Sequence, residues 1–255
     1  MGDRCAGCCG CSAVSDTRDS LVVALVGNPN VGKSTIFNAL TGLNQHTGNW
    51  AGKTVAGAWG RFRWLDKSFT LVDLPGTYSL WARRAEEAVT GDFICFEKVD
   101  AVVVVVDSSC LERNLLLLLQ VLEVASRVVL CVNLQDEARA NGITVDVLRL
   151  EEMLGLSVVA TSAKYQDGLY ELKNVLYRAC TEKCVRAVRK NRYSSQVERA
   201  IEELAPYIVR ALGSSVDVRW VAMRLLEGNT ACVERMKLMM EGIACGKGGE
   251  KNRAE

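Results

Sequence analysis

A glycine-rich segment near the amino terminus limits the fold of this chain more than any other feature. Residues 27–34 read G-N-P-N-V-G-K-S, after the apolar run 21–26 and before a segment of helical character. In a strand, glycine loop and helix of this pattern, backbone N–H groups surround phosphate oxygens, the lysine reaches the β- and γ-phosphates, and the serine hydroxyl can bind Mg²⁺. The positive end of the helix dipole adds to the attraction. The segment therefore predicts a nucleotide phosphate site that uses Lys33 and Ser34.

Up to about residue 182 the chain alternates strand and helix patterns, the order expected of a parallel sheet covered on both faces. Two neighbouring strands are joined by a short turn and must be antiparallel. The pattern predicts an α/β fold of the P-loop NTPase class, with a mostly parallel six-stranded sheet and helices on both faces. The six strands are expected at residues 21–26, 58–64, 69–74, 101–107, 127–132 and 157–160.

Composition divides the chain into four parts. Residues 1–20 are expected to be a cysteine-rich flexible tail, and residues 21–182 to be the nucleotide-binding domain. Residues 194–244 repeat apolar positions at helical spacing without a strand pattern, which predicts a small all-helical domain over residues 183–245. Residues 246–255 are too polar and glycine-rich to fold alone.

The segment 43–56, which contains the single histidine, His46, has interior glycines and no clear periodicity. We expect a mobile loop there, with a solvated histidine.

Charge and hydropathy exclude several functions. The net charge of +1 gives no reason to expect nucleic acid as a partner. No apolar run approaches the roughly 20 residues of a membrane helix, and the amino terminus lacks the apolar core of a signal peptide. We therefore expect this chain itself to be soluble in a reducing cytoplasm, with most of its eleven cysteines in the core.

The amino-terminal thiols are those of Cys5, Cys8, Cys9 and Cys11. Two alternatives stay open for them, a metal or redox site and a flexible tail without such a function.

Polar groups follow three of the predicted strands at their carboxyl ends, where ligands bind in doubly wound folds. Asp73 stands where a nucleotide-binding fold places the carboxylate that holds Mg²⁺ through water, and Gly76 lets the backbone approach a γ-phosphate. Asp136, in N-L-Q-D at 133–136, can accept from both the N1–H and the amino group of guanine, a pair that adenine does not offer. N–H groups of the turn 162–164 can donate to guanine O6. Together these groups predict a guanine nucleotide.

In order and spacing, these motifs are similar to the five guanine-nucleotide motifs of small GTPases. More closely, G-N-P-N-V-G-K-S, T-G-N-W-A-G-K-T, L-V-D-L-P-G-T-Y-S-L, L-E-R-N-L and R-W-V-A-M-R-L-L-E-G resemble the cytoplasmic N-terminal region of FeoB, the bacterial ferrous-iron transporter family. The resemblance spans residues 20–240. It implies a G domain and a helical domain that slows GDP release, both ahead of a membrane part at the cytoplasmic face of the bacterial inner membrane. It also implies GTP hydrolysis with GTP or GDP, Mg²⁺ and K⁺ bound.

Carried over by position, the resemblance assigns roles to individual residues. The expected catalytic set is Thr54, Asn30, Lys33 and Gly76, of which Thr54 closes on Mg²⁺ and the γ-phosphate. The expected Mg²⁺ ligands are Ser34, Thr54 and Asp73, and K⁺ is expected at Asn30 and the backbone of Gly48 and Trp50. The expected nucleotide contacts are Asn28, Asn30, Val31, Gly32, Lys33, Ser34, Thr35, Asn133, Asp136, Ser162, Ala163 and Lys164.

Two positions depart from the usual pattern. Leu134 replaces the lysine that lies over the base in most GTPases, and Thr77 stands where Ras-like GTPases carry the glutamine that orients water. Thr77 is too short for that task, and no arginine is fixed near the phosphate loop by sequence. Positive charge is still needed between the β- and γ-phosphates, and the resemblance implies that K⁺ at Asn30 supplies it. The alternative is that Asn30 only stabilises the turn of the loop.

The leading functional hypothesis is a GTP-hydrolysing switch domain that regulates or gates ferrous iron transport. One alternative is a soluble potassium-dependent GTPase in ribosome or RNA assembly, and another is a cysteine-rich metal-binding adaptor. The expected partners are a guanine nucleotide and the membrane transport domain of the same or a longer polypeptide. Small cytoplasmic regulators and a homo-oligomer are left open.

Overall fold

The computed structural model describes residues 20–42, 46–49, 56–80, 85–182, 193–213, 217–228, 233–234 and 236–237. The expected tails, the amino-terminal cysteine cluster and the basic stretch 183–192 lie outside these residues, as do Trp50 and Thr54.

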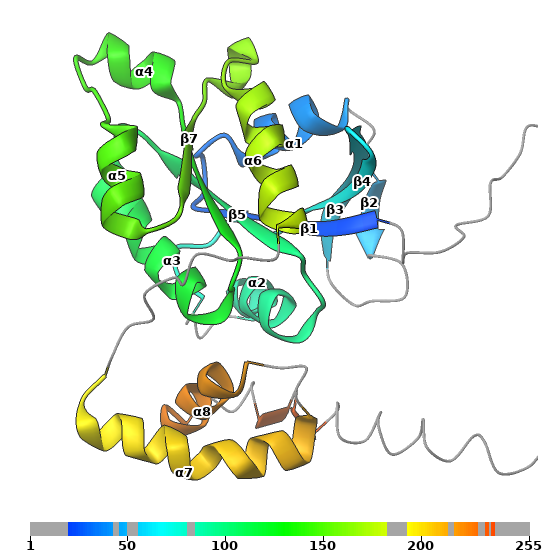
Figure 1. Ribbon diagram of the computed structural model, residues 1–255, viewed down its shortest axis with the longest axis vertical. Coiled ribbons are helices and arrows are strands. Elements are labelled where there is room, and N and C mark those ends of the chain that lie inside the picture. Colours follow the sequence, from blue (N-terminus) through cyan, green and yellow to red (C-terminus); the bar gives the residue numbers. More distant parts are fainter. Residues whose placement is uncertain are drawn as a thin grey trace, which may run out of the picture.

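A seven-stranded sheet in the order β2-β3-β4-β1-β5-β6-β7 is the centre of the structure (Figure 1). β1 pairs in parallel with both β4 and β5, and β6 and β7 continue the parallel part, whereas β3 is antiparallel to β2 and β4. This confirms the predicted mostly parallel fold. The strands are β1 (Ser20–Gly27), β2 (His46–Asn49), β3 (Ala56–Trp64), β4 (Lys67–Asp73), β5 (Ala101–Asp107), β6 (Val128–Asn133) and β7 (Ser157–Ala160).

All six predicted strands are present, and β2 is an additional seventh strand. The expectation of a loop throughout residues 43–56 is wrong at residues 46–49, which pair with β3 from His46 opposite Trp59 to Asn49 opposite Ala56. Such a short edge strand carries no periodic pattern of its own, because the open backbone edge of β3 provides its hydrogen bonds. The described part of this segment is therefore part of the sheet.

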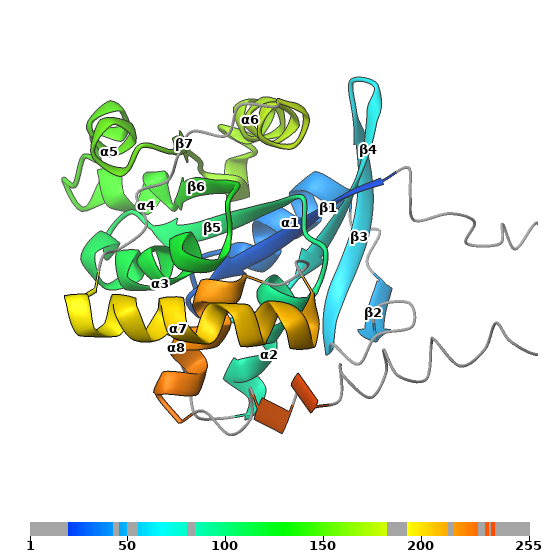
Figure 2. The same cartoon turned by 60° about the horizontal axis from the view of Figure 1, so that its bottom comes forward.

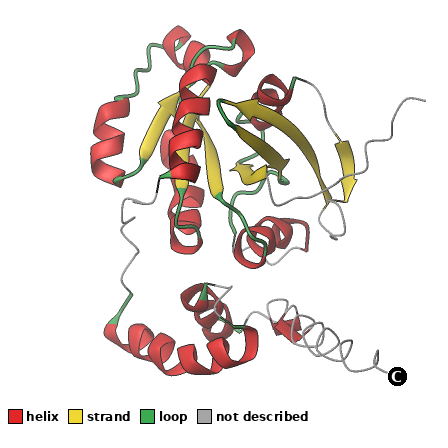
Figure 3. Cartoon of the chain, turned by 45° about the vertical axis from the view of Figure 1, so that its right-hand side comes forward, coloured by secondary structure: helices red, strands yellow, loops and turns green. Residues whose placement is uncertain are grey.

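Helices cover both faces of the sheet and form two separate cores (Figure 3). The apolar residues of β5 alternate between these cores, with Val103 and Val105 in one and Val104 and Val106 in the other. The two covered faces explain the uninterrupted apolar run of this strand. One face carries α1 (Lys33–Thr41) and α6 (Leu169–Thr181), and the other carries α2 (Ala85–Phe96), α3 (Leu111–Val124) and α5 (Val147–Leu154).

Two short elements stand at the carboxyl edge of the sheet, where the predicted base-binding motifs lie. They are α4 (Gln135–Ala140), which follows β6, and the 3₁₀ turn η1 (Ala163–Tyr165), which follows β7.

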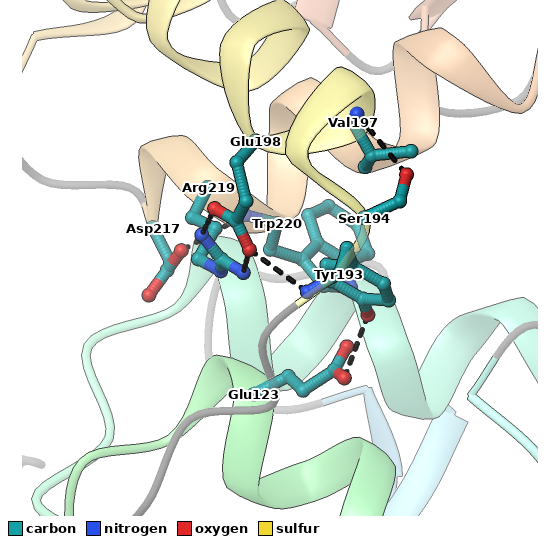
Figure 4. Close-up of polar contacts among 8 residues, drawn as sticks. All are labelled: Glu123, Tyr193, Ser194, Val197, Glu198, Asp217, Arg219 and Trp220. Carbon is teal, nitrogen blue, oxygen red and sulfur yellow. Dashed lines mark hydrogen bonds and ion pairs between the residues drawn. The ribbon is translucent and has the colours of Figure 1, made fainter.

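The predicted helical segment is present as α7 (Ser195–Leu212) and α8 (Val218–Leu226). Ser194 and Asp217 cap these helices by accepting from Val197 N (3.5 Å) and Trp220 N (2.9 Å) (Figure 4). The apolar sides of α7 and α8 form a third core that also contains Cys95 of α2. In Figure 2 both helices lie beside α2 and α3. None of the helices within the described residues has the length and apolar character needed to cross a bilayer.

Candidate nucleotide-binding site

The phosphate loop leaves the carboxyl end of β1 and leads directly into α1, whose first residue is Lys33. A Cβ atom on Gly27 would lie only 2.6 Å from the carbonyl oxygen of Val105, so this position has no room for a side chain. Asn30 (φ 67°) and Gly32 (φ 79°) have the left-handed backbone that asparagine and glycine adopt most readily. The loop therefore presents its N–H groups together with the positive end of α1, as a phosphate site requires.

The three side chains expected at the phosphates and Mg²⁺ lie together. Lys33 Nζ forms an ion pair with Asp73 Oδ1, and Ser34 Oγ donates to Asp73 Oδ2 at 3.2 Å. They meet because β1 and β4, which precede them, are neighbouring parallel strands. A hydroxyl beside a carboxylate supplies the oxygen ligands that Mg²⁺ prefers, so these residues fit that ion.

Asn133 connects three of the sequence motifs through its buried carboxamide. Its Nδ2 donates to the carbonyl oxygen of Val31 in the phosphate loop at 3.0 Å. Its Oδ1 accepts from Thr161 Oγ1 at 2.9 Å and from Ala163 N at 3.1 Å. A Cβ on Gly32 would lie 2.3 Å from Asn133 Nδ2, so this glycine is needed for the close approach. Asn133 therefore fixes the phosphate loop relative to the turn that was predicted to contact the base.

We expect the isosteric change Thr161→Val to lower the free energy of unfolding by about 1–2 kcal/mol, because Asn133 Oδ1 loses one of its two buried donors. Urea denaturation of the full chain would measure this. Thr41→Val is a matched control, since the buried Thr41 hydroxyl donates to the carbonyl of Phe37 within the same helix. Equal losses in the two variants would contradict the bracing role of Asn133.

The residues expected to recognise the base lie at the carboxyl edge of the sheet, beside the phosphate loop. Asp136 N donates to Ser162 Oγ at 3.2 Å, while Asp136 Oδ1 is buried and has no hydrogen-bond partner among the described residues. Such an orphan acceptor is costly unless a ligand donor reaches it, and the N1–H and amino group of guanine are donors of that kind. Since Ala163 N already donates to Asn133, a guanine O6 at this turn would share that donor.

Thr77 is buried, and its hydroxyl is engaged within its own turn. It donates to the carbonyl of Ser79 at 2.7 Å, and Ser79 N lies 3.2 Å from it. Thr77 N donates to the carbonyl of Gly27 at 3.1 Å, so this segment borders the phosphate loop. The Thr77 hydroxyl is thus occupied within its own turn, and its expected failure to replace the missing glutamine stays a prediction.

The structure describes some of the remaining expected site residues and not others. Asn28 and Val31 are buried in the phosphate loop, whereas Thr35 and Lys164 are exposed. Gly48 lies in β2, while Trp50 and Thr54 are outside the described residues. Sequence reasoning gave no role to Thr161 or to Ser108, whose Oγ donates to the carbonyl of Leu134 at 2.9 Å. No motif marks the Ser108 contact, because its partner, Leu134, is distant in sequence and lies between β6 and α4.

The described cysteines support the expectation of core packing. Cys95, Cys131 and Cys180 are buried, and Cys110 is exposed. Burial raises the pKa of the Cys131 and Cys180 thiols to about 12. These thiols therefore stay protonated and unreactive near neutral pH.

Three features define the class of this protein. They are the phosphate loop, the Asp73 carboxylate at the end of the neighbouring strand β4, and an N-x-x-D motif whose asparagine contacts the phosphate loop. Together they are typical of a nucleotide-binding protein of the GTPase fold class. Comparison with known proteins identifies the group within that class. The family model described as "Ferrous iron transport protein B" matches residues 21–176, and that of the "FeoB cytosolic helical domain" matches residues 193–251. The chain belongs to the ferrous iron transport protein B family.

Individual relatives agree with this membership. A Porphyromonas gingivalis Fe(2+) transport protein A/Fe(2+) transporter FeoB fusion protein is 41% identical over 212 residues, which are 81% of this chain and 25% of the relative. The solved cytosolic domain of T. maritima FeoB in apo form is 34% identical with a TM-score of 0.74, and the match covers 86% of each chain. Its GDP form I gives 34% identity and a TM-score of 0.73, over 86% of this chain and 85% of that one. The chain spans about a quarter of the length of the curated relatives it matches.

Proposed function

We propose that the chain binds guanine nucleotides, hydrolyses GTP with Mg²⁺, and serves as a switch that regulates ferrous iron transport. The observation that carries this proposal is the Asn133 carboxamide, which joins the phosphate loop to the turn at Ala163 next to the unpartnered Asp136 oxygen. A single side chain thus fixes the spacing between a phosphate site and an acceptor suited to guanine. The T. maritima relative solved in a GDP form supports the same ligand.

Each of these residues is proposed to contact a different part of the nucleotide. Lys33 and the loop N–H groups would bind the phosphates, and Ser34 and Asp73 would hold Mg²⁺, which would supply positive charge at the phosphates. Asp136 accepts from guanine, while Asn133 holds both loops in place. Asn30, with the backbone of Gly48 and Trp50, is proposed to hold K⁺.

The proposed switch comprises two segments, the stretch 43–56 with Thr54 and the stretch that begins at Gly76. A bound γ-phosphate would bring Thr54 and the Gly76 N–H toward it, and its loss would release them. As part of a longer transporter, the chain would act at the cytoplasmic face of the bacterial inner membrane, with the membrane transport domain as its partner. The ribosome or RNA assembly alternative is disfavoured by the net charge of +1.

The base preference tests this proposal directly. Fluorescence titration of the full chain should show GDP bound far more tightly than ADP, and phosphate release from GTP should require Mg²⁺. Equal affinity for GDP and ADP would contradict the proposed use of Asp136.

Thr54→Ala should leave GDP affinity within about threefold of the wild type and slow GTP hydrolysis by about 10- to 100-fold. The reason is that the hydroxyl contacts the γ-phosphate side only in the closed state, where a hydrogen bond to a charged group contributes about 1.5–3 kcal/mol. Single-turnover hydrolysis and GDP titration measure the two effects separately. A comparable loss of GDP affinity would show that Thr54 serves another purpose.

A further inference from the structure

Leu134 has a backbone conformation that leucine seldom adopts. Its φ of 62° and ψ of 34° lie in the left-handed region, where the Cβ atom comes too close to the following carbonyl oxygen. A residue keeps such a conformation only where its surroundings hold it there. Leu134 stands between Asn133, which contacts the phosphate loop, and Asp136, which has the unpartnered oxygen. Whatever holds Leu134 therefore also sets how these two side chains are placed relative to each other.

Ser108 holds Leu134 from the neighbouring strand. Asp107 and Asn133 are opposite each other in the ladder between β5 and β6, so the next residue, Ser108, lies beside Leu134. The Ser108 N–H donates to the carbonyl of Asn133 at 3.0 Å, and its hydroxyl donates to the carbonyl of Leu134 at 2.9 Å. These carbonyls belong to the two peptide groups that flank the Leu134 Cα, whose orientations are its φ and ψ. One buried serine thus contacts both groups that define the strained conformation.

The peptide group that follows Leu134 has two further hydrogen bonds. Its carbonyl also accepts from Ala138 N at 3.0 Å, which is a bond within α4, and its N–H, that of Gln135, donates to the carbonyl of Thr161 at 3.2 Å. Ser108 and Thr161 therefore connect this peptide group to the sheet from opposite sides. The Ser108 hydroxyl contributes the shorter of these two connections and the only one that a side-chain substitution can remove.

We propose that Ser108 is a positioning residue for base recognition, whose hydroxyl keeps Leu134 left-handed and so aims Asp136 at the N1–H and amino group of guanine. The proposal rests on the proposed guanine-nucleotide function. Ser108 acts through Leu134 and does not itself contact the base. Without its hydroxyl, one connection fewer opposes the strain of Leu134, and Asp136 is held less precisely. Hydrogen bonds weaken with misalignment, so the paired contact with guanine should suffer.

The test compares GDP with IDP, whose base keeps the N1–H and O6 of guanine but lacks the amino group. The ratio of the IDP Kd to the GDP Kd, from fluorescence titration of the full chain, therefore measures the second contact of Asp136. Ser108→Ala removes the hydroxyl and keeps the N–H bond to Asn133. It should lower the ratio by about 3- to 10-fold, roughly the value of one neutral hydrogen bond. A serine that only supports the fold would weaken both nucleotides alike and leave the ratio unchanged.

A second variant tests the role of strain. Asparagine adopts the left-handed conformation more readily than leucine, so Leu134→Asn should need less support from Ser108. In the Leu134→Asn background, Ser108→Ala should lower the ratio by less than about twofold. The two changes affect one contact, so their effects should not add.

Ser109→Ala is the matched control. It removes the hydroxyl of the adjacent serine in the same loop, which donates to Asp107 Oδ1 at 2.6 Å and not to Leu134. This variant should leave the ratio within about twofold of the wild type. Thermal unfolding would establish that each variant is folded.

Three results would overturn the inference: an unchanged ratio in Ser108→Ala, an equal fall in Ser109→Ala, or an equal fall from Ser108→Ala in the Leu134→Asn background. If Leu134→Asn is not folded, the comparison of Ser108→Ala with Ser109→Ala decides alone. A wild type that binds neither nucleotide, or binds GDP and IDP equally, refutes the proposed guanine recognition. If the wild type prefers GDP and Ser108→Ala prefers it to the same degree, only the role of Ser108 is refuted.

Discussion

Asp136→Asn should convert the base site from guanine to xanthine nucleotides. The carboxylate offers two acceptors to the N1–H and amino group of guanine, and its Oδ1 is buried without a partner among the described residues. Each hydrogen bond to a charged group contributes about 1.5–3 kcal/mol. Asparagine keeps only one, neutral acceptor and turns a donor toward the guanine amino group, so GDP binding should weaken by roughly 10²- to 10⁴-fold. Xanthine carries a carbonyl in place of the amino group, and the asparagine Nδ2 can donate to it. XDP affinity should therefore rise by a comparable factor.

Competition titrations with GDP, XDP and ADP would measure this exchange. Glu137→Gln is the matched control, because it removes the charge of the exposed neighbouring carboxylate on α4 and should leave the preference for guanine intact. If Asp136→Asn weakened GDP and XDP binding equally, the residue would have a structural role instead of reading the base.

Hydrolysis should be slow in NaCl and about 10- to 10³-fold faster in KCl at equal ionic strength. Thr77 is neutral and its buried hydroxyl is held by Ser79. No arginine is fixed near the phosphate loop by sequence, so another cation is needed near the β- and γ-phosphates. An arginine finger in that place is worth about 10³–10⁵ in rate, and a monovalent cation should recover part of it. Asn30, exposed in the phosphate loop, is the proposed protein ligand.

The backbone of Asn30 decides which variant is informative. With φ at 67°, Asn30→Ala would strain the loop as well as remove the ligand, whereas Asn30→Gly removes the carboxamide and keeps the left-handed backbone free of strain. Asn30→Gly should abolish the difference between KCl and NaCl and leave GDP affinity within about threefold. Potassium stimulation that persists in Asn30→Gly would leave Asn30 as a turn residue only.

Much of the candidate site was predictable because its chemistry is local in sequence. The phosphate loop depends on glycines and on its place between a strand and a helix, and both are visible in residues 21–40. Asp73, Asn133 and Ser162 could be placed at one edge because parallel strands align their carboxyl ends. The contacts between these residues could not be predicted. That Asn133 uses both ends of its carboxamide on Val31, Thr161 and Ala163 depends on the registers of three strands.

By itself the sequence determined the strand and helix order, the buried character of β5 and the phosphate loop, because each follows from a short pattern and the backbone geometry it imposes. Only the tertiary structure decided that residues 46–49 join the sheet, that Gln120 holds Ser79 and Leu80, and that Glu123 meets Tyr193 across 70 positions of the chain. These contacts join segments far apart in sequence, and no local pattern records which partner a polar side chain meets once the cores have packed. The packing of the cores settles those pairings, because it places the segment after Gly76 and Tyr193 beside the same side of α3, at Gln120 and Glu123.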